Sequence, residues 1–403
     1  MTGSLRGSIV AVHVTFLMAG LAWTSWVARI PQVRDSLGLD AGELGLVLLA
    51  GALGSFAAMP FAGVVVMRLG SARTVQLAAV VAAAGICTAG FGQRESVPAT
   101  VLGLLLFGAG GGTWDIAMNV EAAAVERRAA RAIMARFHAS FSVGTVVGAG
   151  TGAACIALGI GVTTNLGVLA IVAAGSAIVA ARSFLPAVRE VDPVARGESS
   201  RRRRAIALES WREPRTLLIG GFVFCAAFTE GSGSDWIAVT LIDGHGAGAV
   251  LGAFAFGCFV ATMTVSRLIA PWVLARWNRS SVLRAYGTLA IAGVSMLAWG
   301  GSQGVAIAGC VVWGLGISLA FPVAMSAASD DPARAAARVS VVSSIGYTAF
   351  IAGPPFIGLL ADHVGIRDAL AAIVVVLAIG VMLAGSTRQL PVKDDDSAGQ
   401  IVA

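Results

Sequence analysis

Residues 99–121 read ATVLGLLLFGAGGGTWDIAMNVE, an apolar stretch whose only charged side chains are Asp115 and Glu121. A helix needs about 20 mostly apolar residues to cross a hydrocarbon core that is about 30 Å thick. The stretch therefore predicts a transmembrane helix, and it places the carboxylate of Asp115 among side chains that suit lipid. The surroundings of that helix decide what the carboxylate does, and the composition of the whole chain indicates those surroundings.

The chain has 403 residues, of which 57% are apolar and only 12% are charged, and its mean hydropathy is +0.83. Soluble domains carry about 25% charged residues, so this composition indicates an integral membrane protein. The five cysteines lie in apolar runs without a CxxC pair, and we therefore expect neither a disulfide nor a metal site. They are Cys87, Cys155, Cys225, Cys258 and Cys310.

Twelve stretches satisfy the length criterion, and together they predict an all-α membrane protein with twelve transmembrane helices. They cover residues 7–28, 42–66, 74–91, 99–121, 137–160, 163–184, 216–241, 248–272, 284–301, 304–327, 338–361 and 368–386. The first is too long for the core of a signal peptide and carries His13, Trp23 and Trp26, so we expect no cleavage there.

The positions of the basic residues predict the orientation, because Lys and Arg are retained on the cytoplasmic side of the membrane in short loops. With the N-terminus inside, all but four of the 28 Lys and Arg residues fall in inner segments. The four exceptions are Arg29, Arg34, Arg94 and Arg367. We expect a multi-pass plasma-membrane protein with both termini in the cytoplasm. Since the net charge of +6 reflects this topology, we expect no nucleic-acid partner.

The longest polar stretch, residues 185–215, divides the spans into two sets of six. It predicts an N-terminal six-helix bundle (1–184), a cytoplasmic linker (185–215), a C-terminal six-helix bundle (216–386) and a cytoplasmic tail (387–403). The run Arg201–Arg204 in the linker indicates solvated, inside-retained charge, with an anionic-lipid contact as the alternative.

The two halves also match each other in sequence at an offset of about 207 residues. FGAGG (107–111) lies over WGLGI (313–317), and Arg68 lies over Arg276. This repeat predicts two parallel, pseudo-symmetric halves, an arrangement that is common in transporters.

The inner loop between the second and third spans carries a recognisable motif. It reads GVVVMRLGSAR from Gly63 to Arg73, which resembles the G-x-x-x-D-R-x-G-R-[RK] motif of the major facilitator superfamily. Gly63, Arg68 and Gly70 keep the pattern with Arg73 near its basic end, while Met67 stands where the family has Asp. The resemblance implies the fold of that superfamily and a gating role for Arg68, Arg73 and nearby Glu121.

Further stretches resemble the fucose-permease-like branch of this superfamily, over residues 7–386. They are WDIAMN (114–119), FHASFSVG (137–144), EGSGSDW (230–236) and GPPFIGLLAD (353–362). Sugar-carrying members have an acid and an Asn four residues later in the fourth helix, and Asp115 and Asn119 fit these places. Those members also carry an acid late in the first helix, where this chain has Thr24, Ser25 and Arg29 and no carboxylate.

Acidic side chains within the spans are candidates for proton binding. A carboxylate in the bilayer costs about 2.5 to 3.5 kcal/mol and normally faces the bundle interior or a wet cavity. We predict Asp115 and Glu230 as proton-coupling sites, because a carboxylate that is buried in one conformation and hydrated in another takes up and releases a proton. The alternative is a structural carboxylate held by hydrogen bonds. Glu121 lies on another face near the inner mouth and is predicted to form a gating ion pair.

The segment EGSGSD (230–235) contains residues of low helix propensity, so we expect the seventh helix to unwind or kink there. The alternative is a Gly-rich packing contact against the first or the eleventh helix. Substrate sites combine apolar walls with a few polar groups, and on that basis we select Trp23, Trp26, Asn119 and Tyr347. The alternative is that each of these residues serves packing alone.

The sequence thus favours a monomeric secondary active transporter that works by alternating access, coupled to protons, for a small polar solute such as a sugar. One alternative is efflux of amphipathic drugs or metabolites by proton antiport, since polar residues are scarce and Trp is abundant. Another is a receptor or scaffold that transports nothing. No Walker-type loop, HExxH or GxSxG motif with partners is present, so we expect neither an enzyme nor a cofactor.

Overall fold

The computed structural model describes residues 5–94, 96–130, 133–185, 209–331 and 334–389, and this part of the chain is helical without strands. The N-terminal half contains α1 (Leu5–Val27), α2 (Ile30–Leu37), α3 (Ala41–Leu69), α4 (Ser71–Gly92), α5 (Val97–Ala129), α6 (Met134–Ala157) and α7 (Val162–Ala181). The C-terminal half contains α9 (Pro214–Val239), the π-helix η1 (Thr240–Gly244), α10 (Ala249–Leu274), α11 (Arg279–Trp299), α12 (Gln303–Ile317), α13 (Ala320–Ala328), α14 (Ala335–Val364), α15 (Ile366–Ala369), α16 (Ala371–Leu383) and the 3-10 helix η2 (Ala384–Thr387).

Twelve helical segments among the described residues are long and apolar enough to cross a membrane, which confirms the prediction of twelve spans. The predicted linker lies mostly outside the described residues, because residues 186–208 are not described, and so does the tail from residue 390. The run Arg201–Arg204 falls in the undescribed part.

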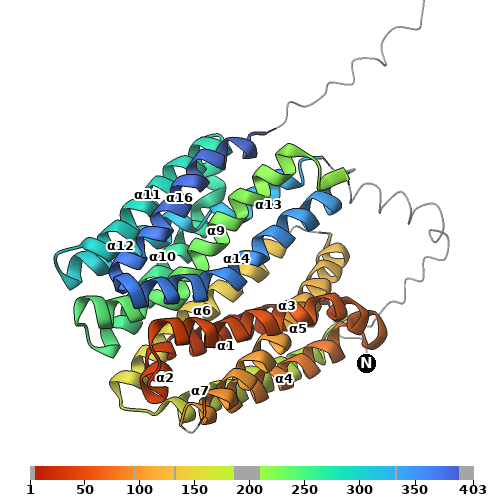
Figure 1. Ribbon diagram of the computed structural model, residues 1–403. Coiled ribbons are helices and arrows are strands. Elements are labelled where there is room, and N and C mark those ends of the chain that lie inside the picture. The colour runs from red at the N-terminus through yellow and green to blue at the C-terminus, as the bar shows by residue number, and fades with distance from the viewer. Residues whose placement is uncertain (1–4, 95, 131–132, 186–208, 332–333, 390–403) are drawn as a thin grey trace, which may run out of the picture.

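Two groups of helices form the molecule, one from each half of the chain (Figure 1). Helices α1 to α7 pack mainly against one another, and helices α9 to α16 do the same. The two groups meet where α3 packs against α14 and where α6 packs against α10. We call the end where α1 begins and η2 ends the terminal end, and the opposite end, where α3 begins and α14 ends, the far end.

The internal repeat appears in the packing of both groups. Gly85 of α4 faces Gly103 of α5 so closely that a Cβ on Gly85 would lie 2.7 Å from the Gly103 carbonyl oxygen. Gly293 of α11 and Gly309 of α12 repeat this contact, with the Gly309 oxygen 2.7 Å from a Cβ on Gly293. Small residues of this kind let helix backbones approach closely in a membrane. The internal sequence repeat therefore corresponds to a repeated glycine contact in the structure.

Local sequence explains how α3 begins at the far end. Asp40 accepts the Glu43 backbone N–H at 2.7 Å, and the Glu43 carboxylate accepts the Asp40 N–H at 3.1 Å. This capping box satisfies two amides that the first turn of a helix leaves free. Gly38 ends α2 with a φ of 66°, a conformation that other residues rarely adopt. The chain therefore turns tightly from α2 into α3.

The Gly- and Ser-rich segment Glu230–Asp235 is helical within α9, so the expectation that it unwinds is wrong. A Cβ on Gly231 would lie 3.1 Å from the Phe350 ring of α14, and a Cβ on Gly233 would lie 2.8 Å from the Phe259 ring of α10. The glycines make room for these aromatic rings, and packing overrides their weak helix propensity. The helix changes its geometry only later, in η1.

Candidate functional site

A cavity of about 420 Å³ lies between the two halves. Helices α1, α3, α5 and α6 line it from the N-terminal half, and α9, α10 and α14 line it from the C-terminal half. Most of the wall is aromatic and aliphatic, and few of the side chains that interrupt it are polar. The charged residues in the wall are Asp115, Glu230, Asp235 and Arg267.

Asp115 projects from α5 into this cavity. It lies deep in the protein, yet its side chain is exposed, because it faces the cavity space. Asn119, one turn further along α5, donates to the Asp115 carboxylate at 3.2 Å and to the Asp115 carbonyl at 2.9 Å. Asn119 itself does not line the cavity. The pair shares one helix face, and the amide holds the carboxylate in place.

Glu230 of α9 is paired with Arg267 of α10, a residue that the sequence analysis did not select. The Arg267 guanidinium donates to both Glu230 oxygens, at 3.0 and 3.2 Å. Both side chains are partly exposed to the cavity, at 31% for Arg267 and 25% for Glu230. The pair therefore keeps two opposite charges in contact at a place that water reaches.

A break in the tenth span fixes the arginine in this position. Between α12 and α13 the helix is interrupted, and the Ser318 carbonyl accepts the Arg267 Nε–H at 3.1 Å. The Ser318 and Ser266 hydroxyls are hydrogen-bonded at 2.6 Å beside it. Arg267 thus connects the acid of α9 to the break in the tenth span.

Asp235 is a second acid of α9 that the sequence analysis quoted but did not select. It lines the cavity, and its side chain makes no hydrogen bond or ion pair with another described residue. The reasoning that selected Asp115 and Glu230 applies to it equally, since it is a carboxylate within a span. The signal was present in EGSGSDW and was passed over.

The aromatic residues selected from the sequence lie in the wall of the cavity. Trp23 stacks on Phe107 with ring centres 6.3 Å apart and is 43% exposed, whereas Trp26 is only 4% exposed. Tyr347 of α14 lines the cavity from the C-terminal half, and Asp115 lines it from the N-terminal half. The cavity wall therefore contains an exposed indole, a phenol and a carboxylate.

The residues selected for gating lie at the terminal end. Arg68 and Arg73 are exposed and make no hydrogen bond with a described residue. Glu121 is 2% exposed and accepts from the Ser71 hydroxyl at 2.5 Å and from the Leu185 N–H at 2.7 Å. It makes no ion pair within the described chain, contrary to the expectation. Its neighbours are a hydroxyl donor and a backbone donor of the same half. These hydrogen bonds satisfy the carboxylate without a cation.

At the far end, polar contacts join the two halves. Arg34, after α1, pairs with Asp243 in η1. The Asp362 carboxylate near the end of α14 accepts the Gly42 N–H at the start of α3. Among the described residues these are the hydrogen bonds that cross between the halves, and none lies at the terminal end. These contacts therefore hold the two halves together at the far end.

The backbones of α3 and α14 also touch at the far end. A Cβ on Gly45 would lie 2.5 Å from the Pro354 carbonyl oxygen and 2.9 Å from the Pro355 Cα. Gly358 likewise faces the Ala41 carbonyl. This contact leaves no room for side chains, and it reinforces the closure made by the ion pair and the helix cap.

Comparison with known proteins agrees with this architecture. Residues 12–348 match the family model of the Major Facilitator Superfamily. An uncharacterized MFS-type transporter of Yersinia pestis is 30% identical over 357 residues, which are 88% of each chain. The match thus extends over nearly all of both proteins.

Solved structures resemble the fold with little sequence identity. A mutant of the nucleoside transporter NupG superimposes with a TM-score of 0.76 at 14% identity, over 95% of this chain and 99% of NupG. A variant of the fucose:proton symporter FucP of E. coli gives a TM-score of 0.63 at 16% identity, over 97% of this chain and 100% of FucP. These similarities establish the fold and leave the cargo open.

Proposed function

This chain belongs to the Major Facilitator Superfamily of membrane transporters, and we propose that it couples proton movement to the transport of a small polar solute by alternating access. The observation that carries the proposal is the position of Asp115, an acid in a cavity between two halves whose hydrogen bonds to each other, among the described residues, lie at the far end. A carboxylate in this place changes its surroundings when the halves rock, because closure of the terminal end would remove it from water.

The proposed orientation follows from the basic residues. We place the terminal end in the cytoplasm and the protein in the plasma membrane, because Lys and Arg concentrate in the segments at that end. In this orientation the structure corresponds to an inward-facing state, with Arg34–Asp243 and Asp362–Gly42 as its outer closure. Rupture of these contacts and closure of the inner end would complete the cycle.

The groups in the cavity suggest how proton and solute share the site. Asp115 is the proposed proton carrier, with Asn119 holding it in position. Glu230, the second proposed proton site, is bound by Arg267, and a solute that competes for Arg267 would release the acid from this ion pair. Trp23 and Tyr347 would contact the solute, the indole by stacking and the phenol by hydrogen bonding. A hydroxylated ring such as a sugar fits this combination.

A second candidate function is supported by the apolar part of the wall. Phe56, Phe107, Phe256 and Phe350 line the cavity together with Met59 and Met263, and such walls also accept amphipathic compounds. Proton antiport of such compounds out of the cell uses the same acids in the opposite direction. The direction of proton-driven flux therefore separates the two functions.

The test uses purified protein in liposomes with an imposed pH gradient and a panel of labelled sugars, nucleosides and amphipathic cations. We expect gradient-driven accumulation of one polar class by the wild type. Asp115→Asn should abolish accumulation and retain exchange of solute down its own gradient, whereas Asp368→Asn, at an exposed acid that does not line the cavity, should change neither. Accumulation by Asp115→Asn at the wild-type level would refute its coupling role. Absence of flux for every compound with folded protein would favour a receptor or scaffold.

A further inference from the structure

A second cavity, of about 730 Å³, lies at the terminal end of the C-terminal half. It is formed where α10 ends, α11 begins, α13 passes and the chain continues after η2. It shares no lining residue with the cavity between the two halves. We infer that this second cavity binds a phosphate group, carried either by a phospholipid headgroup or by a free phosphorylated solute.

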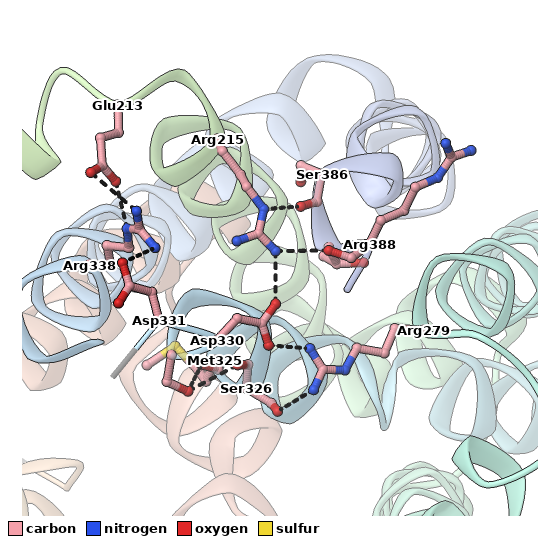
Figure 2. Close-up of polar contacts among 12 residues, drawn as sticks. Glu213, Arg215, Arg279, Met325, Ser326, Asp330, Asp331, Arg338, Ser386 and Arg388 are labelled. Carbon is pink, nitrogen blue, oxygen red and sulfur yellow. Dashed lines mark hydrogen bonds and ion pairs between the residues drawn. The ribbon is translucent and has the colours of Figure 1, made fainter. Parts of the chain in front are cut away.

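Three arginines line the cavity, namely Arg279, Arg284 and Arg388. Arg279 is already engaged, since it donates to Asp330 at 2.7 Å and to the Ser326 hydroxyl at 3.2 Å. Figure 2 shows that the guanidinium of Arg388 extends away from Asp330 and takes part in none of the contacts drawn there. Neither Arg284 nor Arg388 forms an ion pair within the described chain. Two cations therefore remain for a bound anion.

The local acid is already neutralised. Asp330 is held between Arg279 and Arg215, at 2.7 and 2.9 Å, as Figure 2 shows. Its side chain is only 10% exposed and does not line the cavity. Because one carboxylate is shared between two guanidinium groups, the lining keeps a net positive charge. This excess of charge favours an anion with several oxygens, such as phosphate.

The first turn of α11 supplies backbone donors to the same cavity. Asn278 caps this helix by accepting the Ser281 N–H at 2.9 Å. The Val282 N–H donates to the Asn278 carbonyl at 3.1 Å. The amides of Arg279 and Ser280 come before these and are not paired within the described residues. The N-terminus of a helix carries partial positive charge and binds anions.

An independent observation concerns the side chain of Ser280. This residue lines the cavity and is 3% exposed, and its hydroxyl has no hydrogen-bond partner among the described residues. A buried hydroxyl without a partner costs about 1 to 3 kcal/mol and calls for an explanation. Rotation of this hydroxyl toward the cavity would let it donate to a phosphate oxygen bound at this turn. One phosphate group would thus accept hydrogen bonds from the serine, the free amides and the arginines.

Part of the cavity wall is apolar, which admits a lipid as the source of the phosphate. Leu274, Leu319 and Val323 belong to this apolar wall, and Trp277, which also lines the cavity, is 54% exposed. Exposed Trp at the end of a span is typical of the membrane–water interface. An acyl chain could follow the apolar wall while its phosphate reaches the arginines. A soluble phosphate would use the basic wall alone.

The experiment measures the thermal stability of the full-length protein in detergent as a function of ligand concentration. The probes are inorganic phosphate and dihexanoylphosphatidic acid, with dihexanoylglycerol and chloride of equal ionic strength as references. We expect saturable stabilisation by at least one phosphate probe and none by the references. Arg284→Gln combined with Arg388→Gln should weaken that binding by about tenfold or more, because two charged hydrogen-bond donors are lost.

Two further variants make the result specific. Ser280→Ala should weaken binding several-fold while preserving the net charge of the protein. Arg276→Gln removes a nearby arginine that stacks on Trp272 at 4.0 Å and does not line the cavity, so it should bind like the wild type. Stabilisation by inorganic phosphate assigns the site to soluble phosphate, and stabilisation by the lipid alone assigns it to a headgroup. Stabilisation by neither probe, or equal binding by the arginine variants, would overturn the inference.

Discussion

The Asp362 carboxylate accepts the Gly42 backbone N–H with both oxygens, at 3.1 and 3.0 Å, so an acid of one half caps a helix of the other. The stretch GLLADHVGIR (358–367) has Gly, Asp, Gly and a final Arg at the spacing of the G-x-x-x-D-R-x-G-R-[RK] motif. Met67 replaces the Asp of this motif in the loop between the second and third spans. The acid that is missing at the terminal end is thus present at the far end.

Loss of this charge should open the far end. An acid at a helix N-terminus contributes about 1 kcal/mol, so Asp362→Asn should increase the population with an open far end by about fivefold. Spin labels at Ser36 and Val250, which are exposed on opposite halves near the far end, would report the opening as a longer distance.

The matched control for that experiment is another acid of the same region. Asp368 accepts from the Trp299 indole at 3.0 Å, a contact that stays within the C-terminal half. Asp368→Asn should therefore leave the distance distribution unchanged. An unchanged distribution for Asp362→Asn as well would show that the cap does not hold the halves together.

Gly45 tests the backbone contact between α3 and α14 independently of charge. Gly45→Ala places a methyl group 2.5 Å from the Pro354 oxygen, so the helices must separate. We expect the same spin labels to show a several-fold larger open population. Gly63→Ala in the same helix meets nothing within 4 Å and should be neutral or stabilising by up to about 1 kcal/mol. Equal behaviour of the two variants would contradict the assigned contact.

Composition and spacing predicted the fold well because the bilayer imposes a length on every span. The twelve helices, the all-α class and the repeat follow from that constraint and from the glycine positions. Helix propensity misled at Glu230–Asp235, since the rings that fill the space beside Gly231 and Gly233 come from helices distant in sequence. Such neighbours cannot be predicted from the local sequence.

The site was predictable only in part, for a related reason. Asp115, Glu230, Trp23, Trp26 and Tyr347 were selectable because polar or aromatic residues stand out in apolar spans. Arg267 was counted as a topological charge near the end of a span, and its role depends on Glu230 and on the break at Ser318. Asn119 shares the helix face of Asp115 but serves that acid and does not line the cavity.

The ion pair between Glu230 and Arg267 predicts that the effects of substituting these two residues on stability are not additive. Glu230→Gln or Arg267→Gln alone leaves one charge unpaired inside the membrane and should destabilise the protein by about 1 to 3 kcal/mol. The double variant removes both charges and should recover most of that loss, while proton-coupled transport stays absent. The measurement is thermal unfolding in detergent, alongside transport in liposomes. Additive losses in the double variant would show that the two groups do not interact.

Glu213 predicts a pH dependence that is separate from transport. It lies just before α9 and accepts from Arg338 at 2.6 Å and from Arg334 at 2.5 Å. Figure 2 shows the contact with Arg338. Hydrogen bonds from Arg338, together with those from Thr216 and Arg334, lower the pKa of Glu213 from 4.5 to about 2. A depressed pKa means that the charged form is favoured by folding.

The sign of the effect follows from this shift. Stability contributed by Glu213 is fully present above its ordinary pKa of 4.5 and is lost as the pH falls toward about 2. Glu213→Gln should therefore lower the melting temperature by a few °C at pH 7, and its difference from the wild type should shrink below pH 4.5. Glu209→Gln is the control, because Glu209 is 59% exposed and approaches Arg334 only at 3.5 Å. A deficit of Glu213→Gln that stays constant down to pH 3 would mean that shape, and not charge, accounts for its contribution.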